Sequence, residues 1–270
     1  MTPEMREDDL EVVRLGTGDI ADALHHAAFT ITGIDASRKG TVVMSDDLGS
    51  TARVFFPSVL AADVADYLVV ISSGGVTTVN LDTERVKREP FEDLGSVGSA
   101  HLTIADVQAS EIDIPPETAE LQLRVMMAAA LIQNAKAAYH LARDHVRERE
   151  QFGAPLVKIA GVAANLARVQ VEIQRLEAAF GRTTKADATL TDATVLSGVA
   201  ADACNRVARL THQLIGALGI REDYPLQAHT RRIWAARDFP RGEYVDTTRV
   251  GMIARSGGES VVWDVLTTPN

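Results

Sequence analysis

Residues Val146–Leu156 read VREREQFGAPL, and this stretch decides how the second half of the chain is interpreted. It lies between two long segments with helical apolar spacing, so Arg149, Gln151 and Phe152 fall at the turn that joins them. A planar, permanently charged guanidinium suits a pyrophosphate, and an aromatic ring suits the face of an adenine or a flavin. The stretch therefore predicts a site for a pyrophosphate-containing cofactor at the end of a helical hairpin.

Helical spacing of apolar residues continues on both sides of this turn. Residues 117–148 are apolar around most of the predicted helix, with alanines between the larger side chains, so we expect it to be buried within a bundle. In residues 156–181 two sets of apolar residues repeat at heptad spacing: Ile159, Leu166, Ile173 and Phe180, and Val162, Val169 and Leu176. Such a seam is typical of an ordinary helical core and also of a subunit interface, and the sequence leaves both open.

Further helices complete the predicted bundle. They are expected at 190–217, at 226–237 and within 243–255, with Gly219 as a C-cap after the first of them. Because the links between these segments are short, we expect neighbouring helices to run up and down in a bundle.

The chain before Pro115 and Pro116 has a different character, because short β-prone runs alternate with glycine-containing turns. These runs are AFTITGI at 28–34, ARVFF at 52–56, YLVVIS at 67–72, VTTVNL at 76–81 and SAHLTIADV at 99–107. We therefore expect an α+β protein in four parts: a short N-terminal remnant at 1–27, a β-domain at 28–115, a helical bundle at 116–255 and a C-terminal tail at 256–270.

The composition limits the class of protein. The chain has 270 residues, 46% of them hydrophobic, which is enough for one large or two small domains. Its formal net charge of −10 argues against a nucleic-acid partner. No apolar run reaches the about 18 residues of a membrane span, and the N-terminal MTPEMREDDLEVVR lacks the apolar core of a secretion signal. We expect a cytoplasmic protein with a small-molecule or protein partner.

Other catalytic classes have no matching signature in this sequence. His140 and His145 are five residues apart, so they do not share a helical face as a zinc pair spaced i, i+4 would, and no metal site is expected. Cys204 stands alone among helix-forming residues and is expected to be a buried small hydrophobe. The sequence also lacks the G-x-S-x-G elbow, the P-loop and the Rossmann glycine fingerprint of hydrolases, kinases and NAD enzymes.

A second segment, Thr211–Tyr224 (THQLIGALGIREDY), places a glutamine before closely spaced glycines, which let a ligand approach the backbone. With R-x-Q-F-G at 149–153, it resembles the acyl-CoA dehydrogenase family, in which this stretch reads Q-x-x-G-G-x-G. Gln213, Gly216 and Gly219 match, and Ala217 replaces the second glycine. The following YPLQAHTRR resembles the family's Y-P-x-x-R-x-x-R-D region, and AADVADYLVV at 61–70 resembles the entry to a core strand of its β-domain.

This resemblance, which covers residues 50–255, implies an acyl-CoA dehydrogenase-like fold with a small β-domain followed by a four-helix-bundle C-terminal domain. The all-helical N-terminal domain of the family is largely missing, and its flavin loop T-E-x-x-x-G-S-D has only SDDLGST at 45–51 as a counterpart. The resemblance also implies FAD as cofactor. Arg149 would hold the pyrophosphate of an adjacent subunit's FAD, with the other contacts from Gln151 and Phe152, and from Gln213, Gly216 and Gly219 at the adenosine end.

The family's reaction needs a carboxylate that removes a proton from Cα of the acyl thioester while hydride leaves Cβ for the flavin. Most members place this glutamate directly before a glycine after the Y-P segment, whereas here Arg241 precedes Gly242 and Glu243 follows it. A smaller branch places it in the first long helix, at the position of Leu123, and Glu120 lies near one turn earlier. Glu243 and Glu120 are thus the candidate bases, unless both are ordinary surface carboxylates.

The resemblance therefore implies a subunit of an FAD-dependent acyl-CoA dehydrogenase, which desaturates an acyl-CoA between Cα and Cβ. Without its own base, this chain would complete the FAD site of a larger catalytic subunit in an α2β2 heterotetramer, as in actinobacterial steroid degradation, with a steroid-derived acyl-CoA as one possible substrate. An electron-transferring flavoprotein would accept the electrons. Two alternatives remain: a self-sufficient homo-oligomeric enzyme with a displaced base, and a flavin-free subunit that stabilises a partner.

Overall fold

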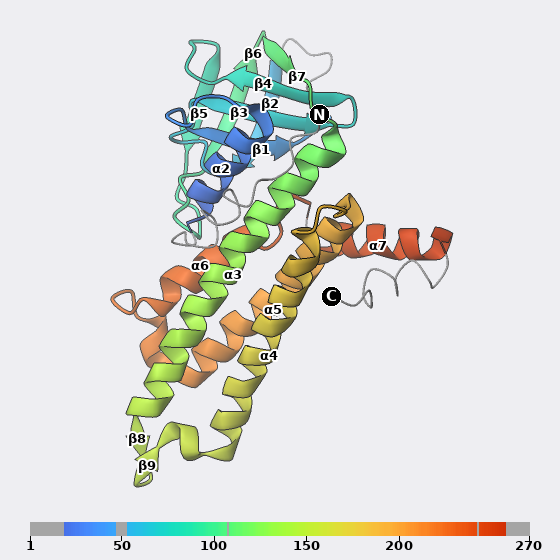
Figure 1. The fold of residues 1–270 in the computed structure, drawn as a ribbon. Coiled ribbons are helices and arrows are strands. Elements are labelled where there is room, and N and C mark those ends of the chain that lie inside the picture. Colours follow the sequence, from blue (N-terminus) through green and yellow to red (C-terminus); the bar gives the residue numbers. More distant parts are fainter. Residues whose placement is uncertain (1–18, 47–52, 107, 242, 258–270) are drawn as a thin grey trace.

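The computed structural model describes residues 19–46, 53–106, 108–241 and 243–257, which form a β-region and a group of long helices that extends from it (Figure 1). Most of the expected N-terminal remnant at 1–27, of the SDDLGST loop at 45–51 and of the tail at 256–270 lies outside the described residues. Within these ranges, no helix combines the length and the apolar character that a membrane crossing requires.

The first described element is a helix, α2 (Ile20–Thr32), so the strand predicted from AFTITGI at 28–34 is wrong. The carboxylate of Asp19 caps the helix by accepting hydrogen bonds from two backbone N–H groups, and Gly33 ends it with a φ of 67°. The hydroxyls of Thr30 and Thr32 donate to carbonyls four residues earlier, which lets these β-prone residues continue a helix. The apolar face that α2 buries outweighs their strand propensity.

The β-region contains two sheets. The larger has the order β1 (Gly40–Met44), β3 (Tyr67–Ser72), β4 (Gly75–Asn80) and β7 (Ala109–Ile112), with only its β1–β3 pair parallel. The smaller is antiparallel, with the order β2 (Arg53–Val59), β6 (Ala100–Ala105) and β5 (Val86–Pro90). Strands β2, β3, β4 and β6 correspond to predicted runs, whereas β1, β5 and β7 were not expected.

Strand β3 contributes to both cores of the molecule, because alternate side chains of a strand point to opposite faces. Tyr67, Val69 and Ile71 pack in the core shared with the helices. Leu68 and Val70 pack in the core that includes residues of the smaller sheet. The larger sheet is therefore the middle layer, between the helices and the smaller sheet.

The helical part consists of long elements close to the predicted ranges: α3 (Pro116–Glu148), α4 (Ala160–Thr183), α5 (Leu190–Ile215), α6 (Leu226–Ala236) and α7 (Glu243–Gly257). Helix α3 begins at Pro116, where a missing N–H costs nothing, and α5 begins with a capping box of Thr189 and Asp192. Helix α3 packs against α4, α5 and α6, and Figure 1 shows it running from the β-region to the far end of the helices.

The heptad seam of α4 is divided between core and surface. Its C-terminal members are buried within this chain: Val169, Ile173, Leu176 and Phe180. At its start Ile159 is 39% exposed, and Val162 and Leu166 are half-buried. The C-terminal half of the seam is thus ordinary core, and only its first turns remain accessible to another chain.

Candidate functional site

The R-x-Q-F-G motif forms a short hairpin at the far end of α3. Strands β8 (Glu150–Gln151) and β9 (Ala154–Pro155) pair around a two-residue turn, in which Phe152 has a φ of 54° and Gly153 a φ of 78°. Two positive φ values in a two-residue hairpin are the pattern of a type I′ turn. A bulky side chain in this left-handed region costs about 1–2 kcal/mol. The turn nevertheless presents Phe152 to solvent, with 92% of the residue exposed.

The second motif forms the end of α5 and the short 3-10 helix η3 (Gly216–Ile220). Gly216, with φ 71° and ψ −147°, is the residue that caps α5, so the prediction of Gly219 as the cap is wrong. A Cβ on Gly216 would meet nothing within 4 Å, so glycine is needed there for its backbone conformation. Gly219 is buried, and a Cβ on it would lie 2.8 Å from Cδ2 of Leu226. It serves close packing and does not line the cavity described next.

The two motifs meet around one cavity of about 750 Å³. The hairpin side contributes Arg149 and Gln151, and the α5 end contributes Gln213 and Gly216. Four of the six predicted cofactor residues therefore line a single hollow, although the two motifs are far apart in sequence. Phe152 and Gly219 are not among the lining residues. Phe152 is available only to a molecule outside this chain, because its ring is exposed at the hairpin tip.

Sequence reasoning missed two polar residues of this cavity, His145 and Glu148. Both lie in the last turn of α3, and His145 is four residues before Arg149, the spacing that puts helical neighbours on one face. Burial lowers the pKa of His145, the nearby Arg149 guanidinium lowers it further, and Glu148 opposes both. At neutral pH the ring is therefore uncharged and can both donate and accept a hydrogen bond.

The cavity suits an anionic group beside Arg149. Within the described part of the chain, no carboxylate pairs with the Arg149 guanidinium, so its donors are free for pyrophosphate oxygens. Gly216 leaves the backbone unobstructed next to it. The residues present therefore fit the pyrophosphate-containing cofactor that the motifs predict. The same described residues contain no group of three or more histidine, cysteine, aspartate or glutamate side chains able to hold a metal ion.

The candidate bases lie elsewhere, where α3 meets α7. Glu243 is the first residue of α7, and its side chain is outside the described part of the structure. Glu120 is buried, and its Oε1 accepts hydrogen bonds from Arg124 at 2.7 and 2.9 Å and from Arg249 at 3.1 Å. Arg241, which the sequence resemblance would place where the family's glutamate is expected, lies 3.7 Å from the same oxygen. Arginines therefore surround this carboxylate.

Arg124 is the centre of this ionic cluster. It is buried, and besides Glu120 it binds both carboxylate oxygens of Asp246, at 2.7 and 2.8 Å. Burial by itself would lower the pKa of Arg124, but the hydrogen bonds and charges of Asp246 and Glu120 outweigh it and raise that pKa. Among the described side chains of α7, only that of Asp246 is fully buried. The cluster thus ties α7 to α3.

Known proteins are similar to this chain in sequence. Residues 120–239 match the family model described as "Acyl-CoA dehydrogenase, C-terminal domain". The short-chain specific acyl-CoA dehydrogenase of Megasphaera elsdenii is 32% identical over 115 residues, which are 40% of this chain and 29% of that relative. The matched segment thus spans less than a third of the relative's length.

Solved structures extend the similarity to the β-region. A variant of the Tcur3481-Tcur3483 steroid ACAD has a TM-score of 0.76 at 22% identity, over 92% of this chain and 80% of that one. Butyryl-CoA dehydrogenase from Megasphaera elsdenii has a TM-score of 0.73 at 17% identity, over 92% and 80%. The ChsE4-ChsE5 complex from Mycobacterium tuberculosis has a TM-score of 0.74 at 15% identity, over 97% and 80%.

These findings confirm the predicted resemblance to the acyl-CoA dehydrogenase family. Residues 120–239 of the helical part are similar to the C-terminal domain of that family, and the α+β fold of the described chain is that of acyl-CoA dehydrogenases. Members of the family are FAD-dependent.

Proposed function

We propose that this chain is a subunit of an FAD-dependent acyl-CoA dehydrogenase that forms one wall of the flavin site and leaves proton abstraction to a partner chain. The observation that carries this proposal is the cavity that joins Arg149 and Gln151 to Gln213 and Gly216. FAD held there would supply the acceptor for the hydride that leaves Cβ of the acyl thioester. This chain contributes binding and orientation.

Each wall of the cavity has a role in this proposal. Arg149 donates charge-assisted hydrogen bonds to the pyrophosphate, and Gln213 with the bare backbone at Gly216 contacts the adenosine end. Gln151 lines the cavity beside Arg149. Phe152 reaches a flavin held by an adjacent subunit, which explains why the hairpin exposes an aromatic ring at a strained turn position.

The described carboxylates at the α3–α7 contact are held by arginines and do not suit the role of the base. Abstraction of the α-proton needs a carboxylate within hydrogen-bond reach of Cα and free to accept a proton. The buried carboxylates at the α3–α7 contact, Glu120 and Asp246, are both bound to Arg124. Arg241 stands where most of the family has its glutamate. We therefore propose that the larger partner subunit supplies the base.

The same proposal includes a partner chain and a class of substrate, which the names of two similar structures support. Two similar structures are described as the Tcur3481-Tcur3483 steroid ACAD and the ChsE4-ChsE5 complex. These names support a partner that is a different chain and a steroid-derived acyl-CoA as substrate, and the sequence resemblance adds the α2β2 assembly with a larger catalytic subunit. An electron-transferring flavoprotein would then reoxidise the flavin.

The proposal is tested by replacing Arg149 in the complex with its full-length partner. Arg149→Ala removes charge-assisted hydrogen bonds of about 1.5–3 kcal/mol each, so flavin affinity should fall about tenfold or more. Arg147→Ala is the matched control, because Arg147 is exposed on the same turn of α3 and does not line the cavity. Flavin retained per complex is measured by absorbance after gel filtration. Equal flavin content in both variants would refute the role of Arg149.

A further inference from the structure

The proposed flavin cavity contains a titratable residue, His145, that the proposed function does not use. His145 lines this cavity together with Arg149 and Glu148, and all three belong to the last turn of α3 or to its C-cap. The R-x-Q-F-G motif begins only at Arg149, so the motif does not include the histidine. Because His145 faces the same space as Arg149, it can contact the same bound group.

His145 and Arg149 are placed together by the helix, since residues four apart lie on one helical face. The backbone N–H of Arg149 donates to the carbonyl of His145 at 2.9 Å, so the helical geometry holds as far as Arg149. The charge of the Arg149 guanidinium lowers the pKa of His145, an effect that requires the two side chains to be near each other. One anion can therefore reach both.

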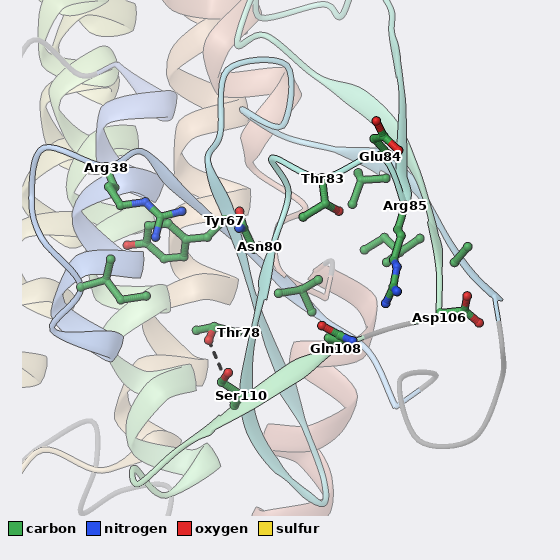
Figure 2. Close-up of a pocket in the computed structure, with 15 residues that line it drawn as sticks. Arg38, Tyr67, Thr78, Asn80, Thr83, Glu84, Arg85, Asp106, Gln108 and Ser110 are labelled. Atoms are coloured by element: carbon green, nitrogen blue, oxygen red, sulfur yellow. Dashed lines mark hydrogen bonds between the residues drawn. The ribbon is translucent and has the colours of Figure 1, made fainter.

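Arginines also line a hollow of about 610 Å³ in the β-region, but they do not converge (Figure 2). Arg38 lies over the Tyr67 ring at one end of that hollow, and Arg85 lies at the other end. Glu84 and Asp106 add negative charge to its lining. The cavity at the end of α3 differs from it, because its arginine and its histidine come from a single helical turn.

Glu148 lies on the other side of His145 from Arg149. Relative to a given residue, the third following residue of a helix is turned by about 60° in one direction and the fourth by about 40° in the other. Glu148 also raises the pKa of Tyr224, which does not line the cavity. The carboxylate is thus near both His145 and Tyr224, and the Arg149 side of the imidazole ring remains open to an anion.

The opposite wall of the cavity brings no further charge to His145. Among the described residues that line this wall, Gln213 is polar and uncharged, and residues 214–218 are apolar or glycine. His212 precedes Gln213 in α5, but its Nε2 lies 2.9 Å from the hydroxyl of Thr230 in α6. The charge of the His145 ring therefore depends on its burial and on its neighbours in the same turn.

An anion beside Arg149 would change the charge of His145. Burial and the Arg149 guanidinium lower the pKa of the ring, so it is neutral at pH 7. The negative charge of a pyrophosphate favours the protonated imidazole, in which both ring nitrogens are donors. Its hydrogen bond to the anion is then charge-assisted. By linkage, an anion that increases the proton affinity of the ring is itself bound more tightly at lower pH.

We propose that His145 is a further binding residue of the flavin site, which takes up a proton from solvent when the pyrophosphate of FAD binds beside Arg149. This inference rests on the proposed function, because it takes FAD as the bound molecule. Arg149 supplies a permanent charge, and His145 supplies a charge that depends on pH. The site should therefore hold flavin more tightly in slightly acidic solution than in slightly alkaline solution.

The test uses the complex with the full-length partner after its flavin has been removed. The affinity for added FAD is measured at pH 6 and at pH 8 from the change in flavin fluorescence. The pyrophosphate of FAD keeps the same charge over this range, so a change in affinity comes from the protein. We expect FAD to bind about fivefold more tightly at pH 6.

Two variants separate a titrating role of His145 from a structural one. His145→Gln keeps a polar side chain but cannot take up a proton, so its affinity for FAD should differ less than about twofold between the two pH values. His145→Lys is charged at both pH values and should bind FAD tightly at both. His140→Gln is the control, because His140 is exposed on α3 and does not line the cavity. It should keep the pH dependence of the unchanged complex.

Equal affinities at pH 6 and pH 8 in the unchanged complex would overturn the inference. The same pH dependence in His145→Gln as in His140→Gln would also overturn it. The proposed function would survive both results, because it depends on the loss of flavin in Arg149→Ala. Flavin binding that does not change in Arg149→Ala would overturn the proposed function and, with it, this inference.

Discussion

The ionic cluster between α3 and α7 is expected to contribute to the free energy of unfolding, and its loss can be estimated from the structure. Arg124 is buried and forms hydrogen bonds of 2.7–2.9 Å with Glu120 and Asp246. Arg124→Met leaves Asp246 without these bonds and Glu120 with fewer partners. Removing one partner of a buried ion pair costs about 3–5 kcal/mol, because the remaining charge is buried and uncompensated. The unfolding free energy of a typical domain is only about 5–15 kcal/mol, so Arg124→Met should remove a large fraction of it.

The assay is urea denaturation followed by circular dichroism, with Arg206→Met as the matched control. Arg206 pairs with Asp202 and Glu172, but its side chain is 56% exposed. An exposed pair contributes about 0–1 kcal/mol, so the control variant should lose little stability. Trypsin should also cleave within α7 faster in Arg124→Met than in the control. Equal losses of stability, or unchanged cleavage, would refute the view that this cluster holds α7.

Three other results are expected. Gly219→Ala places a Cβ 2.8 Å from Cδ2 of Leu226, so overpacking should cost about 1–3 kcal/mol in the same urea assay, and a loss below that would show that the turn can relax. Burial raises the pKa of the Cys204 thiol to about 12, so a thiol reagent at pH 8 should modify the chain only after unfolding, and rapid labelling of the native protein would contradict the structure. Burial also lowers the pKa of three histidines below the usual value of about 6.5. Near and below that pH, these histidines therefore bind more protons in the unfolded chain than in the folded chain. Stability should therefore fall as pH decreases from 7 to 5.5, and an increase over that range would contradict the half-buried, neutral state of His145, His212 and His229.

Local sequence patterns predicted the long helices of the bundle well, because apolar helical spacing depends only on residues that are close in sequence, but they failed for α2, which was predicted as a strand. The long apolar segments at 117–148 and 156–181 correspond to α3 and α4 with small differences at their ends. Strands with buried, alternating positions, such as β3 and β6, were also found. Strands β5 and β7 were missed because they lie at sheet edges and are mostly exposed, so VKREP and ASEI show no apolar alternation.

Features that depend on contacts between residues far apart in the sequence could not be predicted from local patterns. The meeting of Arg149 with Gln213 and Gly216 was expected only from the family resemblance, because the spacing of the two motifs does not by itself place them together. The position of Glu120 was not predictable in this way, since its environment depends on Asp246 and Arg249, more than a hundred residues away. The hollow beside Arg38 and Arg85 likewise forms from separate loops and left no motif.

The central claim is that this chain completes a flavin site that a partner chain makes catalytic. The most direct test is to purify the chain alone and together with a full-length homologue that carries the glutamate, and to record the visible absorption spectrum and mass of each. We predict a yellow complex of two different chains, and a lone chain without flavin. A yellow homo-oligomer whose flavin is reduced on addition of acyl-CoA would contradict the claim, as would a colourless complex.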